Sequence, residues 1–208
     1  MRLWSNSWIN GDPIPARCAA TRIDPATGKV VWSANRHPHL AWDEVPAGTL
    51  SFALIAQDFD GLPDEAAGLA EANVPEDLPR RDFFHWVLAD LPASLREIPE
   101  AAMGEGFVPG GQPPKTWAPM RSGLNDLTRW FARDAALAGR YLGYDGPLPP
   151  VGDPLVHHYV VTLHALDVAR APVDEPFDGE ALRRAIYPHV LAAATLSGTY
   201  SLHPRHRT

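Results

Sequence analysis

Length, composition and charge exclude several classes of protein before any motif is considered. A chain of 208 residues can bury most of its apolar surface in one core, so we expect a single domain over residues 1–208. The formal charge of −7 argues against nucleic acid or an anionic membrane surface as the main partner, because both attract positively charged proteins. No apolar stretch approaches the roughly 20 residues that cross a bilayer.

Two further features indicate the compartment. The single cysteine, Cys18, cannot form an internal disulfide. The opening MRLWSNSWIN lacks the basic segment and apolar stretch of a secretion signal. We therefore expect a cytoplasmic protein without stable membrane insertion.

The first half of the chain predicts strands separated by turns. A short strand is expected at 30–34 (VVWSA) and a strong one at 49–58 (TLSFALIAQD), in which both alternating faces are largely apolar. Such a strand is typical of the inside of a layered stack. Residues 63–81 are too long and acidic for a hairpin turn and predict a surface excursion with one or two helical turns. Another strong strand follows at 83–91 (FFHWVLADL).

The second half of the chain alternates two helices with two strands. Asp178 is a suitable N-cap for a helix at 179–187, and Pro188 ends that helix. Because 22 prolines and 16 glycines are spread along the chain, helix is scarce and a mainly β fold is expected. The predicted elements are a helix at 127–139, a strand at 157–168, a helix at 179–187 and a strand at 195–202.

The first two strong strands carry polar side chains that a core does not need. Asp58 ends the face of its strand that bears Leu54 and Ala56, and Asp60 follows in the loop. A lone buried carboxylate costs several kcal/mol, so Asp58 is expected to meet a partner or a polar pocket. By the period of two, His85 shares a face with Val87 and Ala89.

The third strong strand places His157 on the same face as Tyr159, Val161 and Leu163. Three strands thus bring a carboxylate, two imidazoles and a phenol toward one place. The loop before this strand, GYDGPLPP (143–150), has prolines that fix its shape and glycines that let a ligand approach the backbone. Imidazolium, phenol and backbone N–H groups donate hydrogen bonds, which favours an oxyanion as the ligand.

Four blocks of the sequence stand out, in this order: SNSWINGDPIP, HPHLAWDEVPAGTLSFALIAQDFD, FFHWVLADLPAS and GYDGPLPPVGDPLVHHYVVTLHALDV. Together they resemble the phosphatidylethanolamine-binding protein family, and specifically its bacterial Raf-kinase-inhibitor-like branch. The resemblance implies a mainly β fold, a Greek-key sandwich of two antiparallel sheets with a few short helices, one near the C-terminus. It also implies a small anion-accepting pocket at one end of the sandwich.

The resemblance implies which residues bind. The family's Asp-Pro-Asp-x-Pro motif corresponds to residues 58–63, its strand histidine to His85, its Gly-x-x-Pro-Pro-x-Gly loop to residues 146–152, and its His-Arg-Tyr to residues 157–159. Phe59 stands in place of the first proline, one residue is inserted before Pro63, and His158 replaces the arginine. The expected ligand-binding residues are Asp58, Asp60, His85, Trp86, Gly146, Pro149, Pro150, His157 and Tyr159, and Phe83 keeps an aromatic wall beside them.

The expected function is non-catalytic binding, without cofactor, of phosphate or a phosphorylated head group such as phosphoethanolamine. His157, Tyr159 and the loop backbone would donate hydrogen bonds, while Asp58 and His85 orient the ligand. The resemblance further implies a homodimer and leaves open a regulatory role against a kinase or protease. The segments 63–81 and 127–142 look longer than in the smallest members and could form a lid or an oligomer contact.

Three alternatives remain open at this point. Asp58 and His85 could form a buried pair that only stabilises the fold. His85, His157 and Asp58 could be a facial triad for iron in a metal-dependent enzyme. The pocket end could also dock a phosphorylated segment, a protease or a kinase. The better-known hydrolase, nucleotide and zincin motifs are absent from the sequence.

The remaining histidines have simpler interpretations. His37 and His39 flank Pro38, which favours a structural turn over a metal site. His158 is expected at the surface or between the sheets, and His164 is expected to be packed within its strand. The tail 203–208 is expected to be solvated.

Overall fold

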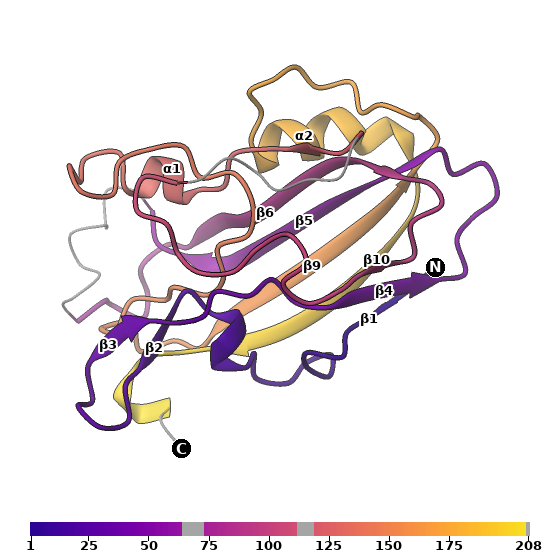
Figure 1. Cartoon of the computed structure of the whole chain (residues 1–208). Coiled ribbons are helices and arrows are strands. Elements are labelled where there is room, and N and C mark those ends of the chain that lie inside the picture. The colour runs from indigo at the N-terminus through magenta and orange to yellow at the C-terminus, as the bar shows by residue number, and fades with distance from the viewer. Residues whose placement is uncertain (64–72, 112–118, 207–208) are drawn as a thin grey trace.

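A five-stranded antiparallel sheet is the centre of the computed structural model, which describes residues 1–63, 73–111 and 119–206 (Figure 1). The strand order is β10-β9-β5-β6-β8. Its members are β5 (Ser51–Gly61), β6 (Arg81–Pro92), β8 (Arg121–Ser122), β9 (His157–Leu166) and β10 (Val190–Tyr200).

A smaller antiparallel sheet packs on one face of the large sheet. Its order is β1-β4-β7, with β1 (Arg2–Trp4), β4 (Leu40–Asp43) and β7 (Glu97–Ile98). The main apolar core lies between the two sheets and includes Trp42, Leu54 and Leu163. A separate hairpin, β2 (Thr21–Ile23) and β3 (Val30–Trp32), lies toward the end of the molecule that also holds the C-terminus (Figure 1).

The opposite face of the large sheet is covered by helix α2 (Gly179–Ile186) (Figure 1). Leu182 and Ile186 of the helix pack with Ile55 and Val87 of the sheet in a second apolar cluster. Strand β5 is therefore buried on both faces, which explains why its sequence is apolar at consecutive positions. The β-sandwich with a helix near the C-terminus is confirmed.

Most predicted elements are present, with shifted boundaries. The predicted strands at 30–34, 49–58, 83–91 and 157–168 correspond to β3, β5, β6 and β9. Strand β10 begins at Val190, before the predicted start at 195, because its alanine-rich first half pairs with β9. Asp178 caps α2 as predicted: its Oδ1 accepts a hydrogen bond of 2.8 Å from the Ala181 amide. The short strands β1, β2, β4, β7 and β8 were not predicted.

The prediction of a helix at 127–139 is wrong beyond the first turn, because only that turn is helical. Helix α1 spans only Leu127–Trp130, and turns follow. The Asp134 side chain accepts a hydrogen bond of 2.8 Å from the Ala136 amide, a local turn that competes with helix. Residues 64–72 of the predicted excursion 63–81 lie outside the described residues, and residues 73–80 contain turns without helix.

The C-terminal tail contacts the body of the protein as far as it is described. Residues 204–206 form a 3-10 turn, η4 (Pro204–His206). His206 Nε2 lies 2.9 Å from the Pro154 carbonyl, and Arg205 pairs with Glu76 at 2.7 Å. Residues 204–206 are exposed to solvent, as expected, but these contacts hold them against the body of the protein. Within the described ranges, the 3-10 turn η1 (Ala16–Cys18) lies between β1 and β2, and η3 (Tyr187–His189) lies between α2 and β10.

A β-bulge changes the direction of His85. The pairing of β5 with β6 shifts register between Ala56 and Gln57. Ala56 pairs with Trp86 and Gln57 pairs with Phe84, so no residue of β5 pairs with His85. Val87 packs on the α2 side of the sheet, whereas the His85 ring lies 5.3 Å from the Tyr159 ring on the sandwich side. The expectation that His85 shares a face with Val87 and Ala89 is wrong because the bulge breaks the alternation.

No helix in the three described ranges is long and apolar enough to cross a membrane.

Candidate functional site

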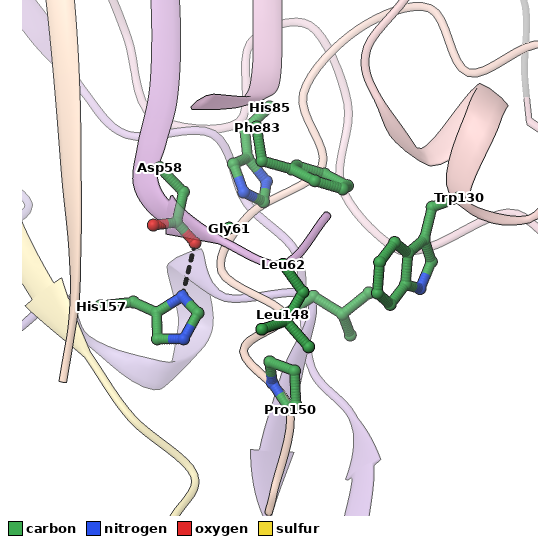
Figure 2. A pocket seen from close by; sticks show the side chains of 9 residues that line it. All are labelled: Asp58, Gly61, Leu62, Phe83, His85, Trp130, Leu148, Pro150 and His157. Atoms are coloured by element: carbon green, nitrogen blue, oxygen red, sulfur yellow. Dashed lines mark hydrogen bonds and ion pairs between the residues drawn. The ribbon is translucent and has the colours of Figure 1, made fainter. Parts of the chain in front are cut away.

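Three strands bring Asp58, His85 and His157 to one small cavity at the end of the large sheet (Figure 2). The cavity has a volume of about 30 Å³. Asp58 comes from β5, His85 from the bulge in β6, and His157 from the first position of β9. Apolar side chains complete the wall, and the full lining is Asp58, Gly61, Leu62, Phe83, His85, Trp130, Leu148, Pro150 and His157.

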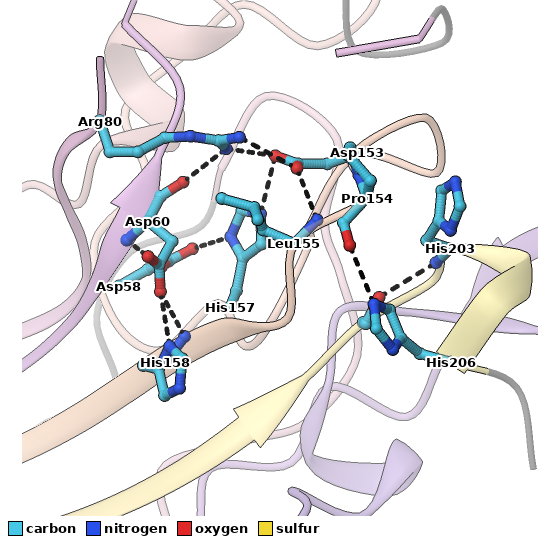
Figure 3. A network of polar contacts seen from close by, with 11 residues as sticks. Asp58, Asp60, Arg80, Asp153, Pro154, Leu155, His157, His158, His203 and His206 are labelled. Atoms are coloured by element: carbon cyan, nitrogen blue, oxygen red, sulfur yellow. Dashed lines mark hydrogen bonds and ion pairs between the residues drawn. The ribbon is translucent and has the colours of Figure 1, made fainter. Parts of the chain in front are cut away.

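His157 is held between two carboxylates. Its Nδ1 lies 2.6 Å from Asp58 Oδ2, and its Nε2 lies 3.1 Å from Asp153 Oδ2 (Figure 3). Burial alone lowers the pKa of an imidazole, but the two carboxylates outweigh it and raise the pKa of His157 to about 9. His157 is thus an imidazolium at neutral pH, and both of its N–H groups are already used within the protein.

Arg80 completes this group of charges. Its guanidinium donates to both oxygens of Asp153, one bond being 3.1 Å, and to the backbone carbonyl of Asp60 (Figure 3). Burial alone would raise the pKa of Asp153. The hydrogen bonds from His157 and Arg80 lower this pKa by a larger amount, so it lies well below the usual range. Two carboxylates, Asp58 and Asp153, therefore face two cations, His157 and Arg80, and these four charges balance, while the neighbouring Asp60 carboxylate pairs with His158.

His85 is neutral and keeps one ring nitrogen for a ligand. Burial lowers its pKa, and its Nδ1 donates a hydrogen bond of 2.7 Å to the Asp145 carbonyl. With the proton on Nδ1, the other nitrogen, Nε2, is an acceptor. Nε2 makes no hydrogen bond of normal geometry among the described residues, although the Gly146 backbone also lies beside the ring.

Asp145 is the anchor that orients His85, and it is itself held from two sides. Its carboxyl accepts hydrogen bonds from Asn35 at 2.9 Å and from Asn125 at 2.8 Å. Burial raises the pKa of Asp145 to about 6, and the two amides partly oppose that shift. These contacts fix the backbone at residue 145 and hence the tautomer and direction of the His85 ring.

Of the nine expected binding residues, four line the cavity: Asp58, His85, Pro150 and His157. Asp60 instead accepts hydrogen bonds from the backbone and ring of His158, at 2.8 and 2.9 Å. Trp86 is fully buried in the core, with its ring beside those of His37 and Tyr144. Pro149 lines a neighbouring groove.

Gly146 and Tyr159 line a second, separate cavity of about 20 Å³ that borders the other side of His85. Gly146 passes so close to the Cys18 carbonyl that a Cβ would lie 2.0 Å from that oxygen, so a glycine is required by chain packing. The Tyr159 hydroxyl is buried without a hydrogen bond of normal geometry among the described residues. Burial and the nearby Asp58 raise its pKa well above the usual value.

Sequence reasoning missed Arg80, Asp153 and the wall residue Trp130. It placed Asp145 and Leu148 in the rim loop 143–150 and Leu62 in the motif 58–63, but gave none of these three a role. Arg80 lies in the excursion 63–81, whose path no periodicity predicts. Asp153 offered one signal, because it stands four residues before His157 in a loop that must return to the same strand end. Phe83 is the aromatic wall that the sequence predicted.

The other histidines have structural roles, and the geometry does not support the iron alternative. His37 Nε2 accepts a hydrogen bond of 2.8 Å from the Met103 amide, and His39 Nδ1 accepts one of 3.0 Å from Asn6. Burial lowers the pKa of His164 to about 4. The described residues contain no group of three His, Cys, Asp or Glu side chains that could hold a metal ion.

The expectation that His157 and Tyr159 donate hydrogen bonds to an oxyanion is wrong for this cavity, because Asp58 and Asp153 occupy both His157 N–H groups and Tyr159 lines the other cavity. The polar groups left facing the cavity are hydrogen-bond acceptors. The Asp58 carboxylate and His85 Nε2 accept, and the N–H groups of His157 are occupied. A ligand group that carries its own donor, such as an ammonium or a protonated phosphate oxygen, therefore matches these acceptors.

Comparison with known protein families gives one match along nearly the whole chain. The family model described as phosphatidylethanolamine-binding protein matches residues 4–201. The chain is 32% identical over 201 residues to the UPF0098 protein YbhB of Escherichia coli, covering 97% of this chain and all of that protein. It is 28% identical to a UPF0098 protein of Aquifex aeolicus, covering 96% of this chain and 88% of that one.

Solved structures agree on the fold. The crystal structure of Escherichia coli YbcL, described as a member of the mammalian PEBP family, superposes with a TM-score of 0.67 at 24% identity, covering 96% of this chain and 97% of that one. A putative PEBP homologue, CT736 of Chlamydia trachomatis, gives a TM-score of 0.63 at 24% identity, covering 96% of each chain.

Proposed function

Because the chain belongs to the phosphatidylethanolamine-binding protein family, we propose that it is a non-catalytic binding protein whose cavity takes a phosphorylated head group such as phosphoethanolamine. The observation that carries the proposal is the meeting of Asp58, His85 and His157 around one cavity, with His85 Nε2 left for a ligand. No residue in this arrangement is an activated nucleophile.

The balance of charge permits an anionic ligand, and the acceptor groups Asp58 and His85 Nε2 require that the ligand also carry a donor. Asp58 does not repel an anion strongly, because His157 and Arg80 compensate the two carboxylates. Phosphoethanolamine carries an ammonium and, in its monoprotonated form, a P–OH group, and either one can donate to His85 Nε2 or to Asp58. Free phosphate has the P–OH donor but no ammonium, so we expect it to bind more weakly.

Titration of the imidazole NMR signals tests the proposal. O-phosphorylethanolamine at millimolar concentration is expected to shift the His85 signals, because the ligand contacts Nε2. The His164 signals are the internal control, since this histidine is mid-strand on β9 and does not line the cavity. Unchanged His85 signals at saturating ligand, or equal shifts of both histidines, would contradict the proposal.

The cytoplasmic location, the homodimer and the kinase or protease partner stay predictions.

A further inference from the structure

An apolar groove of about 410 Å³ adjoins the polar cavity. It lies between the β2–β3 hairpin, the turns around α1 and the proline loop that precedes β9. Trp130, Leu148 and Pro150 line both the cavity and the groove, and all three are half-buried. They form the rim between the two, on the apolar side of the cavity, away from Asp58 and His157 (Figure 2).

The far wall of the groove is an aromatic surface that is already in place. The Trp32 indole stacks on Phe107, with ring centroids 3.9 Å apart and an angle of 6° between the planes, and Phe107 stacks in turn on Tyr141. Trp32 nevertheless remains 47% exposed. A wall held by such contacts loses little entropy on binding, so most of the apolar area it buries contributes to affinity.

The groove differs from the cavity in chemistry. None of its described lining side chains is charged, and Thr21 is the one polar residue among them. The size of the groove is within the range of pockets that hold drug-sized ligands, about 300–1,000 Å³. An uncharged apolar group fits it, whereas a second head group does not.

We propose that this groove is the second half of the binding site and holds one uncharged apolar arm, aliphatic or aromatic, of the same small molecule whose phosphorylated head enters the cavity. The inference rests on the proposed function, because the head group places the arm at the rim formed by Trp130, Leu148 and Pro150. The ligand is then a soluble phosphate monoester with a single apolar substituent.

A series of alkyl phosphates tests the two halves separately by calorimetry. Methyl phosphate probes the cavity, and butyl and hexyl phosphate, below their micellar concentrations, also reach the groove. A fully buried methylene contributes about 0.8 kcal/mol, so affinity is expected to rise about two- to fourfold per added carbon. The matched variants are Trp32→Ala in the groove and Trp4→Ala on β1, which removes another partly exposed tryptophan outside the groove.

Trp32→Ala is expected to bind methyl phosphate like the parent and hexyl phosphate about fivefold more weakly, while Trp4→Ala leaves both unchanged. If methyl phosphate binds but affinity does not grow with chain length, the head-group proposal stands and the groove is overturned. If neither O-phosphorylethanolamine nor methyl phosphate binds, the proposed function fails. If O-phosphorylethanolamine binds but no alkyl phosphate does, the head-group proposal stands and the groove is overturned. Hexyl binding through Trp32 alone would overturn the two-part site. Tighter binding to vesicles of phosphatidylethanolamine than to hexyl phosphate would overturn the single-arm assignment in favour of a two-chain lipid.

Discussion

At the scale of single residues, His157 couples folding to pH. Its folded pKa of about 9 exceeds the ordinary value of about 6.5 for an unfolded chain. A histidine shifted in this direction contributes its full stabilisation below about pH 6.5. That contribution is lost as pH rises through about 9, because the folded protein then gives up a proton that the unfolded protein has already released.

The variant His157→Gln isolates this contribution. Glutamine keeps polar atoms near Asp58 and Asp153 but has no titratable proton, so its free energy of unfolding is expected to vary less than the parent's between pH 6.5 and 9. At pH 6.5 the variant is expected to be about 3–5 kcal/mol less stable, because breaking one side of a buried ion pair leaves the carboxylates uncompensated. Urea unfolding at several pH values measures both effects.

The neighbouring His158→Gln is the matched control, because its side chain is 63% exposed and pairs only with Asp60 at the surface. It is expected to follow the parent at every pH. If His157→Gln shows the same decline toward pH 9 as the parent, the decline does not come from His157.

The charged and imidazole side chains of the site were predictable from the sequence where they lie on strands. Asp58 and His157 carry a charge or an imidazole at the end of an apolar alternation, a pattern that a core does not explain. Arg80 and Asp145 lie in loops, where no periodicity relates sequence position to direction in space. Their roles depend on contacts with residues 73 and 110 positions away, Asp153 and Asn35 respectively.

At the scale of elements, the bulge in β6 and the close contact of β5 with β6 shape the cavity. Gly61 ends β5 where a Cβ would lie 2.7 Å from the Phe83 Cβ and 2.9 Å from the Arg81 carbonyl. Gly179 begins α2 where a Cβ would lie 2.2 Å from the Phe84 ring. The two glycines thus allow close packing at the site and on the opposite face of the sheet.

The substitutions Gly61→Ala and Gly179→Ala separate the site from the fold. Each is expected to cost about 1–3 kcal/mol, because overpacking forces neighbouring atoms apart. Gly61→Ala is also expected to weaken phosphoethanolamine binding at least about tenfold, because it displaces Phe83 at the cavity wall, whereas Gly179→Ala leaves affinity unchanged. Urea unfolding and NMR titration measure the two quantities, and equal losses of affinity in both variants would contradict this division.

Elements were predictable where local preference and tertiary contacts agree. Helix α2 has a capping aspartate, an apolar face and a proline after it, and it was predicted nearly to the residue. The first half of β10 and the segment 131–139 are both rich in alanine, which favours helix in isolation. Pairing with β9 makes the former a strand, and the turn at Asp134 ends helix in the latter, so tertiary and side-chain contacts decided both.

At the scale of the whole molecule, β5 joins the two apolar clusters. Leu54 belongs to the core between the sheets, and its neighbour Ile55 belongs to the cluster under α2. Neither cluster can lose its packing without exposing one face of the same strand. The expectation of one domain over residues 1–208 then becomes a prediction about cooperativity: the chain unfolds in one transition.

The variant Leu182→Ala in α2 tests this cooperativity from a distance. Leu182 is fully buried under the sheet, and the core tryptophans Trp8, Trp42 and Trp86 lie in the other cluster. Truncating a buried leucine costs about 2–5 kcal/mol, which in a chain of this size lowers the melting temperature by about 5–15 °C. Because β5 couples the clusters, tryptophan fluorescence and far-ultraviolet circular dichroism are expected to report the same lowered midpoint.

Glu180→Ala is the control for that experiment, since it changes an exposed residue of the same helix and should leave the midpoint within about 1–2 °C of the parent. An early loss of helical signal in Leu182→Ala, with the fluorescence transition unmoved, would mean that the α2 face unfolds by itself. In that case the site end of the sheet would keep its structure without the helix, and the cavity would depend only on the sandwich. With a single shared transition, the arrangement of Asp58, His85 and His157 persists only while both faces of β5 stay covered.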